Sequence, residues 1–182
     1  LPKVETLTTM PVTPYAVSKL ATEAYALSYQ QVFGWEAVAF RFSNVFGPLQ
    51  RAGHAYAAVV PAFVEAALAG RPLPIHGDGG QTRDFTYVGS VAEVITEVLT
   101  SGLTSPTPVN LAFGTRFSLL ELIDLLEKLL DRPLERAHTD PRAGDVRDSQ
   151  ADQTALRALV PNLEPVDLET GLRATIAWFQ SL

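Results

Sequence analysis

The chain has 182 residues, of which 47% are hydrophobic and 19% charged, a composition typical of one soluble globular unit. Its formal net charge of −6 argues against a nucleic-acid or an anionic membrane surface as a partner. It holds no cysteine, which excludes disulfides and thiolate chemistry and is compatible with a cytoplasmic, reducing compartment. No apolar run is long enough to span a membrane.

The first predicted element is a long helix that starts after Thr13 and stops before Gly34. Thr13 suits the N-cap, Pro14 suits the first helical position, and Gly34 supplies the stop. Tyr15 and Lys19 are four residues apart, so they lie one above the other on one helix face. A neighbouring cation favours the phenolate that a tyrosine needs to act as a base near neutral pH. The pair is therefore either a proton-transfer site or an exposed lysine beside a half-buried tyrosine.

A buried strand and a helix are predicted next. Residues 35–42 form a stretch that is short and apolar enough for a buried strand. Residues 43–53 predict a loop, because their Gly and Pro residues interrupt regular structure. Asn44 directly follows the strand, where sites often form, although asparagine is also a common turn residue. A helix is predicted over about 57–69.

The middle of the chain predicts two extended pieces and a capped helix. Residues 72–77 are extended, residues 78–80 make a turn, and residues 83–88 predict a strand. Ser90 and Glu93 match a capping box that opens a helix to about residue 100.

The remaining residues continue the alternation of short strands and helices. A strand is predicted at 109–112, a second capping box (Ser118 and Glu121) opens a leucine-striped helix to about residue 130, and 133–137 predicts a strand. Two helices, near 153–159 and 168–181, each follow an aspartate that suits the N-cap, Asp152 and Asp167. This alternation indicates an α/β fold.

Two arginines stand beside aspartates in polar stretches. Arg83 with Asp84 is either a surface ion pair of small energetic value or an anion-binding arginine for a group such as a diphosphate. Arg142 with Asp145 is either a pair of solvated loop charges or part of a site. The three histidines show no ligand spacing, so no metal site is expected.

Several segments, taken in order, resemble one family. The chain is similar to the C-terminal part of extended short-chain dehydrogenases/reductases, the NAD-dependent nucleotide-sugar epimerases and dehydratases, and most similar in character to UDP-glucose 4-epimerases. The segments that carry the resemblance are Tyr15-Ala16-Val17-Ser18-Lys19, Arg41-Phe42-Ser43-Asn44-Val45-Phe46-Gly47-Pro48, Ala58-Val59-Val60-Pro61, Pro74-Ile75-His76-Gly77-Asp78-Gly79, Arg83-Asp84-Phe85, Tyr87-Val88 and Arg142-Ala143-Gly144-Asp145.

The resemblance implies a fold and two sets of site residues. Residues 1–50 would be a remnant of the Rossmann domain that binds NAD, and residues 51–182 mainly a small α/β substrate-binding domain. Tyr15 would be the catalytic acid/base, Lys19 would hold the nicotinamide ribose, and the backbone around Ser43 would approach the nicotinamide. The residues implied for the UDP-sugar are Asn44 with Arg83 and Arg142 at the diphosphate, Val59 and Pro74, Ile75 and His76 along the uridine, and Asp145 near its ribose.

The sequence departs from the family pattern at three places. Leu49-Gln50 stands where Arg-Gln is common, which removes one candidate cation, and Gly89-Ser90 stands where an aspartate pair is usual. The Gly-rich fingerprint of the cofactor half would precede Leu1. We therefore expect that this chain alone neither binds NAD well nor catalyses.

The expected function of the full-length protein is NAD-dependent epimerisation of a UDP-glucose/UDP-galactose-type substrate through a keto-sugar intermediate. A nucleotide-sugar 4,6-dehydratase and a non-catalytic UDP-sugar-binding or dimerisation fragment are the alternatives. The resemblance also implies a homodimer formed through the helix that carries Tyr15 and Lys19.

Overall fold

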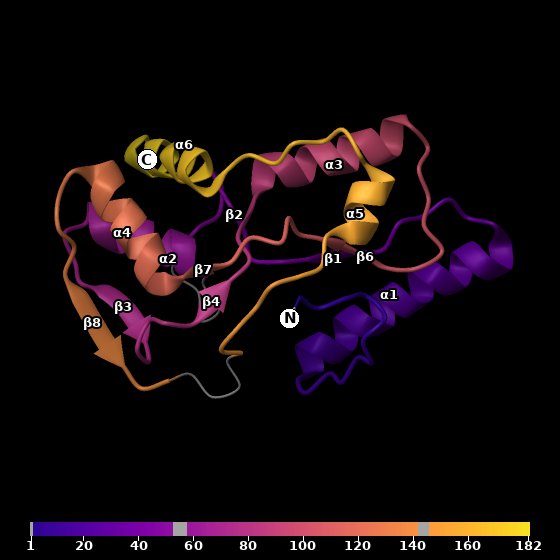
Figure 1. Cartoon of the computed structure of the whole chain (residues 1–182), viewed down its shortest axis with the longest axis horizontal. Coiled ribbons are helices and arrows are strands. Elements are labelled where there is room, and N and C mark those ends of the chain that lie inside the picture. The colour runs from indigo at the N-terminus through magenta and orange to yellow at the C-terminus, as the bar shows by residue number, and fades with distance from the viewer. Residues whose placement is uncertain (1, 53–57, 142–145) are drawn as a thin grey trace.

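The computed structural model describes residues 2–52, 58–141 and 146–182 and shows the expected mixture of helices and strands (Figure 1). The helices are α1 (Pro14–Phe33), α2 (Val59–Leu68), α3 (Val88–Thr100), α4 (Leu119–Leu130), α5 (Thr154–Leu159) and α6 (Leu168–Gln180). The strands are β1 (Phe40–Phe42), β2 (Val45–Phe46), β3 (Leu73–His76), β4 (Thr82–Arg83), β5 (Thr86–Tyr87), β6 (Val109–Leu111), β7 (Phe117–Ser118) and β8 (Arg136–Thr139). None of the helices in these ranges is long and apolar enough to cross a bilayer.

Short strand pairs connect distant parts of the chain. β1 pairs with β6, β2 with β5 and β3 with β8, all parallel, whereas β4 and β7 are antiparallel. Of the strand predicted at 35–42, only the last three residues pair, and the strand predicted at 83–88 is divided between β4 and β5. The strand predicted at 133–137 lies at 136–139 instead, where it can align with β3.

The predicted local caps of α1, α4 and α6 are confirmed. The Thr13 hydroxyl accepts a hydrogen bond from the Ala16 N–H at 3.1 Å, and Gly34 ends α1 with a φ of 71°. Ser118 and Glu121 form the predicted capping box of α4. Asp167 caps α6. The N-cap of α5 is Gln153, not Asp152 as predicted, and the Asp152 side chain instead accepts a hydrogen bond from the Thr154 N–H at 2.9 Å.

The capping box predicted at Ser90 and Glu93 is wrong. α3 starts three residues earlier, with Tyr87 as its N-cap, so Ser90 lies inside the helix and is fully buried. The Ser90 hydroxyl accepts a hydrogen bond from the Val166 N–H at 2.9 Å, far along the chain. A long-range contact therefore replaces the local cap that the sequence pattern predicted.

Two hydrophobic clusters form the core. The larger lies among α2, β3, α4 and α6 and includes Phe63, Ile75, Leu122 and Leu172. The smaller lies among α3, β6 and α5, with Val94, Leu111 and Leu156 at its centre, and Phe40 of β1 packs against it. Burial of these apolar side chains stabilises the fold by roughly 25 cal/mol per Å² removed from water.

Helix α1 packs more loosely than the other helices. It lies on the opposite side of β1 and β6 from α3, away from α2, α4 and α6 (Figure 1). No residue of α1 is buried. Its partly covered residues follow helical spacing and form one stripe along the helix: Ala16, Leu20, Glu23, Ala26, Leu27 and Gln30.

Candidate functional site

Tyr15 and Lys19 lie in the first turns of α1, as their spacing predicts. The Lys19 ammonium nitrogen is 5.4 Å from the centroid of the Tyr15 ring. Tyr15 is 71% exposed, so its hydroxyl is open to a ligand. The arrangement places a cation beside a phenol at an accessible surface, which is the chemistry needed for proton transfer by a tyrosine.

Ser43 and Asn44 follow β1 directly, at its carboxyl end. The Ser43 hydroxyl donates to the Asp84 carbonyl at 3.1 Å, and the Asn44 amide donates to the same carbonyl at 3.4 Å. Asn44 has a φ of 33°, a left-handed conformation that asparagine tolerates better than most residues. Asn44 is thus a turn residue, and its exposed side chain also stands at a strand end, where ligands commonly bind in α/β folds.

Asp84 is not the partner of a surface ion pair. It is fully buried, and its carboxylate accepts hydrogen bonds from the Thr115 N–H at 3.1 Å, the Thr115 hydroxyl at 2.9 Å and the Ala151 N–H at 3.0 Å. Burial raises the pKa of the Asp84 carboxyl, while these hydrogen bonds act in the opposite direction. The neighbouring Arg83 donates from one guanidinium nitrogen to the carbonyls of Thr82, at 2.7 Å, and Val146, at 2.8 Å.

An extended segment that no sequence pattern predicted, residues 146–152, docks beside Arg83. The Thr82 N–H donates to the Arg147 carbonyl at 2.8 Å, and the Thr82 hydroxyl donates to the Asp148 carboxylate at 2.8 Å. No periodic pattern marks this segment, since its hydrogen bonds to Thr82, Gly114 and Arg116 join residues more than thirty positions apart. Arg142 and Asp145, which immediately precede it, lie outside the described residues.

The residues implied for the uridine divide between surface and core. In β3 the side chains alternate, so Pro74 and His76 are exposed, whereas Ile75 is fully buried in the larger core cluster. The His76 ring nitrogen Nδ1 lies 2.9 Å from the Thr139 hydroxyl, its partner in the β3–β8 register. Val59 begins α2 and is partly buried. Ile75 therefore presents no accessible surface to a uridine, unlike its neighbours Pro74 and His76.

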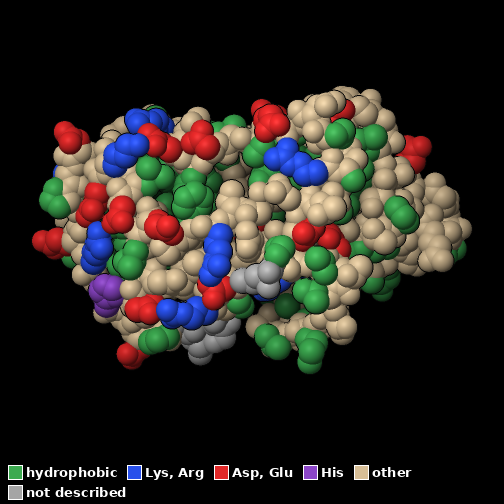
Figure 2. Space-filling model, viewed as in Figure 1, with side chains coloured by type: hydrophobic (Ala, Val, Ile, Leu, Met, Phe, Trp, Pro, Cys, Tyr) green, Lys and Arg blue, Asp and Glu red, His purple; other side chains and the backbone are tan. Residues whose placement is uncertain are grey.

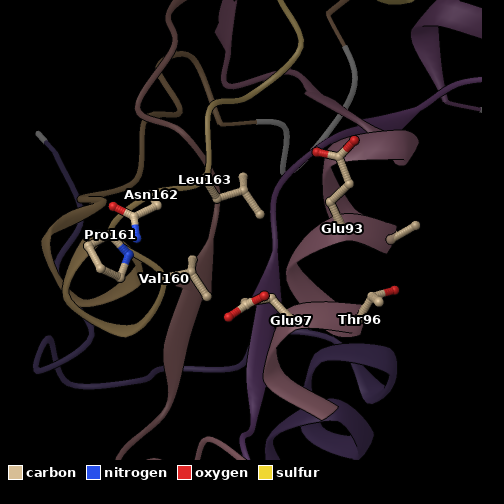
Figure 3. A pocket seen from close by; sticks show the side chains of 8 residues that line it. Glu93, Thr96, Glu97, Val160, Pro161, Asn162 and Leu163 are labelled. Atoms are coloured by element: carbon tan, nitrogen blue, oxygen red, sulfur yellow. The ribbon is translucent and has the colours of Figure 1, made fainter. Parts of the chain in front are cut away.

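A surface groove of about 520 Å³ lies elsewhere, between α3 and residues 160–163 (Figure 3). Glu93 and Glu97 project from α3 along it, and Asn162 lies on its opposite wall. Two carboxylates would repel a diphosphate, and none of the predicted site residues lines this groove. On the face seen in Figure 2, acidic and basic side chains are intermingled over the helices.

The protein-family model described as the NAD dependent epimerase/dehydratase family matches residues 1–112. The UDP-glucose 4-epimerase of Mycolicibacterium smegmatis is 33% identical over 181 residues, which are 99% of this chain and 57% of that protein. The chain spans about half the length of the curated relatives that it matches.

Solved structures agree in fold. A UDP-N-acetylglucosamine 4-epimerase from Methanobrevibacter ruminantium, solved with UDP-N-acetylmuramic acid, matches with a TM-score of 0.92 and 34% identity over 100% of this chain and 58% of that chain. A UDP-glucose 4-epimerase from Thermotoga maritima, solved with UDP-glucose, matches with a TM-score of 0.89 and 32% identity over 99% of this chain and 57% of that chain. The α/β arrangement is therefore that of Rossmann-type short-chain dehydrogenase/reductase epimerases. By its sequence and its fold, the chain belongs to the NAD-dependent epimerase/dehydratase family.

Proposed function

We propose that the protein containing this chain is an NAD-dependent 4-epimerase of UDP-sugars of the glucose/galactose type. The observation that carries the proposal is the exposed Tyr15 with the Lys19 ammonium 5.4 Å from its ring, at the start of α1. The names of the relatives support the substrate class, because two of the three proteins described above are UDP-glucose 4-epimerases.

The described residues fit part of the NAD molecule. The Lys19 ammonium offers three donors, which suits the hydroxyls of a ribose, and it is exposed beside Tyr15. NAD, when bound, supplies the acceptor for a hydride from the sugar. The pyrophosphate of NAD calls for a Gly-rich turn at a helix N-terminus, for which this sequence offers no match. We propose that residues outside this sequence hold that part of the cofactor.

In this proposal, the chain supplies the residues that transfer the proton and the residues that bind the substrate diphosphate. Tyr15, in its phenolate form, takes the proton of the sugar hydroxyl, and Lys19 stabilises that phenolate. The Asn44 amide and the Arg83 guanidinium hold the substrate diphosphate, as donors of the kind that anionic oxygens accept. Once the keto-sugar has turned over, Tyr15 would return the proton to the same oxygen. The hydride that completes the epimerisation would come back from the reduced cofactor.

The test is Tyr15→Phe in the natural protein that carries this chain, with UDP-glucose and NAD supplied. We expect turnover to fall by about 10²-fold or more while UDP-sugar binding persists. Tyr29→Phe, on the same helix, is the matched control, because Tyr29 contacts Phe33 and Trp35 through its ring. Unchanged turnover in Tyr15→Phe would refute the assignment. A product lighter by one water would instead identify a dehydratase.

We also propose that the protein is a homodimer formed through α1. Tyr25 and Val32 are 69% and 67% exposed and lie on the face of α1 opposite the partly covered stripe. A second copy of α1 would cover this apolar face. Val32→Lys should shift the sedimentation coefficient from dimer to monomer, whereas Leu99→Lys, on the exposed side of α3, should not. A wild-type monomer in sedimentation would contradict the dimer.

A further inference from the structure

An ion pair links the helix that carries Tyr15 to the strand that ends at Ser43. The Arg41 guanidinium of β1 donates to both carboxylate oxygens of Glu23 in α1, with its Nε and one terminal nitrogen each at 2.7 Å. The side chains are only 27% and 16% exposed. A planar guanidinium that bonds both oxygens fixes the angle between the two groups as well as their distance.

Arg41 is itself held from the sheet side. Its remaining terminal nitrogen donates to the Glu5 carbonyl at 3.0 Å, and the Glu5 carboxylate accepts from the Asn110 N–H of β6 at 2.9 Å. The Asn110 amide also donates to the Lys3 carbonyl at 3.0 Å. These contacts hold the guanidinium in place relative to β1 and β6, independently of its bond to Glu23 in α1.

Packing alone leaves α1 weakly placed, because none of its residues is buried. Glu23 lies in the middle of the stripe that faces the sheet. The side-chain bond from Gln30 to the Ala37 carbonyl, at 3.3 Å, is longer and lies two turns further along. The Glu23–Arg41 pair is thus the strongest polar contact described between α1 and the strands.

The Glu23–Arg41 pair lies close along the chain to both parts of the proposed site, Lys19 on α1 and Ser43 after β1. Glu23 follows Lys19 by one helical turn, about 6 Å along the axis. Arg41 precedes Ser43 by two residues, about 7 Å along the strand. α1 and β1 run in opposite directions, so both steps lead to the same end of the molecule (Figure 1).

We infer that Glu23 and Arg41 are positioning residues that set the register of α1 against β1, so that Tyr15 and Lys19 face the Ser43–Asn44 end of the strand. The inference rests on the proposed function, since it concerns the geometry of that proton transfer. A misplacement of about 1 Å in such a site can cost about 10²-fold in rate without weakening ground-state binding.

The test compares Glu23→Gln with Glu65→Gln in the natural protein with NAD bound. Gln at position 23 keeps the size of the side chain but loses its charge and one acceptor, whereas Glu65 pairs with Arg71 on the exposed surface of α2. We expect kcat to fall at least tenfold in Glu23→Gln with KM for the UDP-sugar changed by less than about twofold. Glu65→Gln should retain wild-type kcat and KM.

A second variant and a second measurement cover the case in which Glu23→Gln does not fold. Arg41→Lys keeps the charge but loses the two-point contact, so a smaller fall in kcat is expected. Amide hydrogen exchange in α1 should accelerate in either variant, while β6 keeps its protection. Unchanged kcat in both variants, or a fall in kcat matched by a rise in KM and loss of protection throughout the fold, would overturn the inference.

The measurements separate this inference from the proposed function. A wild-type protein that turns over no UDP-sugar refutes the proposed function. The exchange of α1 amides then decides whether the ion pair still sets the register of the helix. A wild-type protein that turns over UDP-sugar with kcat insensitive to Glu23 and Arg41 refutes only the positioning role.

Discussion

The side-chain carboxylate of Asp84 accepts a hydrogen bond at 3.0 Å from the backbone N–H of Ala151, 67 residues further along the chain. Its other oxygen accepts from Thr115, and its carbonyl accepts from the side chains of Ser43 and Asn44. One fully buried residue thus connects the end of β1 with two segments from later in the sequence. Its carboxylate holds those segments, while its backbone holds the strand end proposed to bind the diphosphate.

Asp84→Asn should destabilise the fold by about 2 kcal/mol, because the amide nitrogen must face a backbone donor where the carboxylate offered an acceptor. Urea unfolding of the two proteins at neutral pH measures the difference. Asp148→Asn is the control, since Asp148 lies in the same segment as Ala151 but bonds the half-buried Thr82 and the exposed Arg116. Equal effects of the two substitutions would show that the buried carboxylate has no special role.

The free energy of unfolding should depend on pH in a way that reports the raised pKa of the Asp84 carboxyl. Its folded-state pKa is raised by burial, so the folded chain binds this proton more tightly than the unfolded chain. The stability that this contributes is complete below the ordinary pKa of about 3.9 and is lost as the pH rises through the raised value. The stability of wild type relative to Asp84→Asn should therefore decrease from about pH 4 upward. An increase over that range would contradict the raised pKa.

Ser90→Ala should cost about 1–2 kcal/mol, because it leaves the Val166 N–H without its buried acceptor. Glu93→Gln should change stability by less than about 0.5 kcal/mol, since Glu93 does not take part in a capping box. Thermal unfolding followed by circular dichroism distinguishes the two. Similar losses of stability in both variants would instead support the capping box that the sequence pattern predicted.

Gly171→Ala should destabilise the packing of α6 by about 1–3 kcal/mol. A Cβ at this position would lie 2.8 Å from Phe46 Cζ and 2.8 Å from Tyr87 Cδ2, closer than carbon atoms approach without displacement of the rings. Gly34→Ala is the comparison, because nothing lies within 4 Å of its Cβ and only its positive φ opposes the change. Chemical denaturation should rank Gly171→Ala as the less stable variant, and the reverse order would contradict the contact.

The sequence predicts those features that depend on neighbouring residues. Thr13, Pro14 and Gly34 bound α1, and Ser118 with Glu121 caps α4, since each pattern is completed within a few positions. The proximity of Tyr15 and Lys19 follows from helical spacing in the same way. A local pattern fails where a distant residue takes its place, as Val166 does at the Ser90 hydroxyl.

The features that the sequence did not predict depend on contacts over long separations. β2 and β7 are two-residue strands whose partners lie some forty positions away, too short to show an alternating pattern. The burial of Asp84 depends on Thr115 and Ala151, which nothing in its own neighbourhood indicates. The roles of Asn44, Val59, Pro74 and His76 toward a UDP-sugar came from the family resemblance and stay predictions.

The path of the chain through its two hydrophobic clusters has a consequence for how the protein responds to proteolytic cleavage. Residues 38–45 contribute to the smaller cluster, residues 46–87 to the larger and residues 91–113 to the smaller. Residues 117–134 contribute to the larger cluster, residues 155–163 to the smaller and residues 168–179 to the larger again. No single peptide-bond cleavage between these stretches leaves both clusters whole. A protease nick at a surface loop would instead yield two pieces that need each other to stay folded, so the nicked chain should migrate as one particle until denaturant separates it.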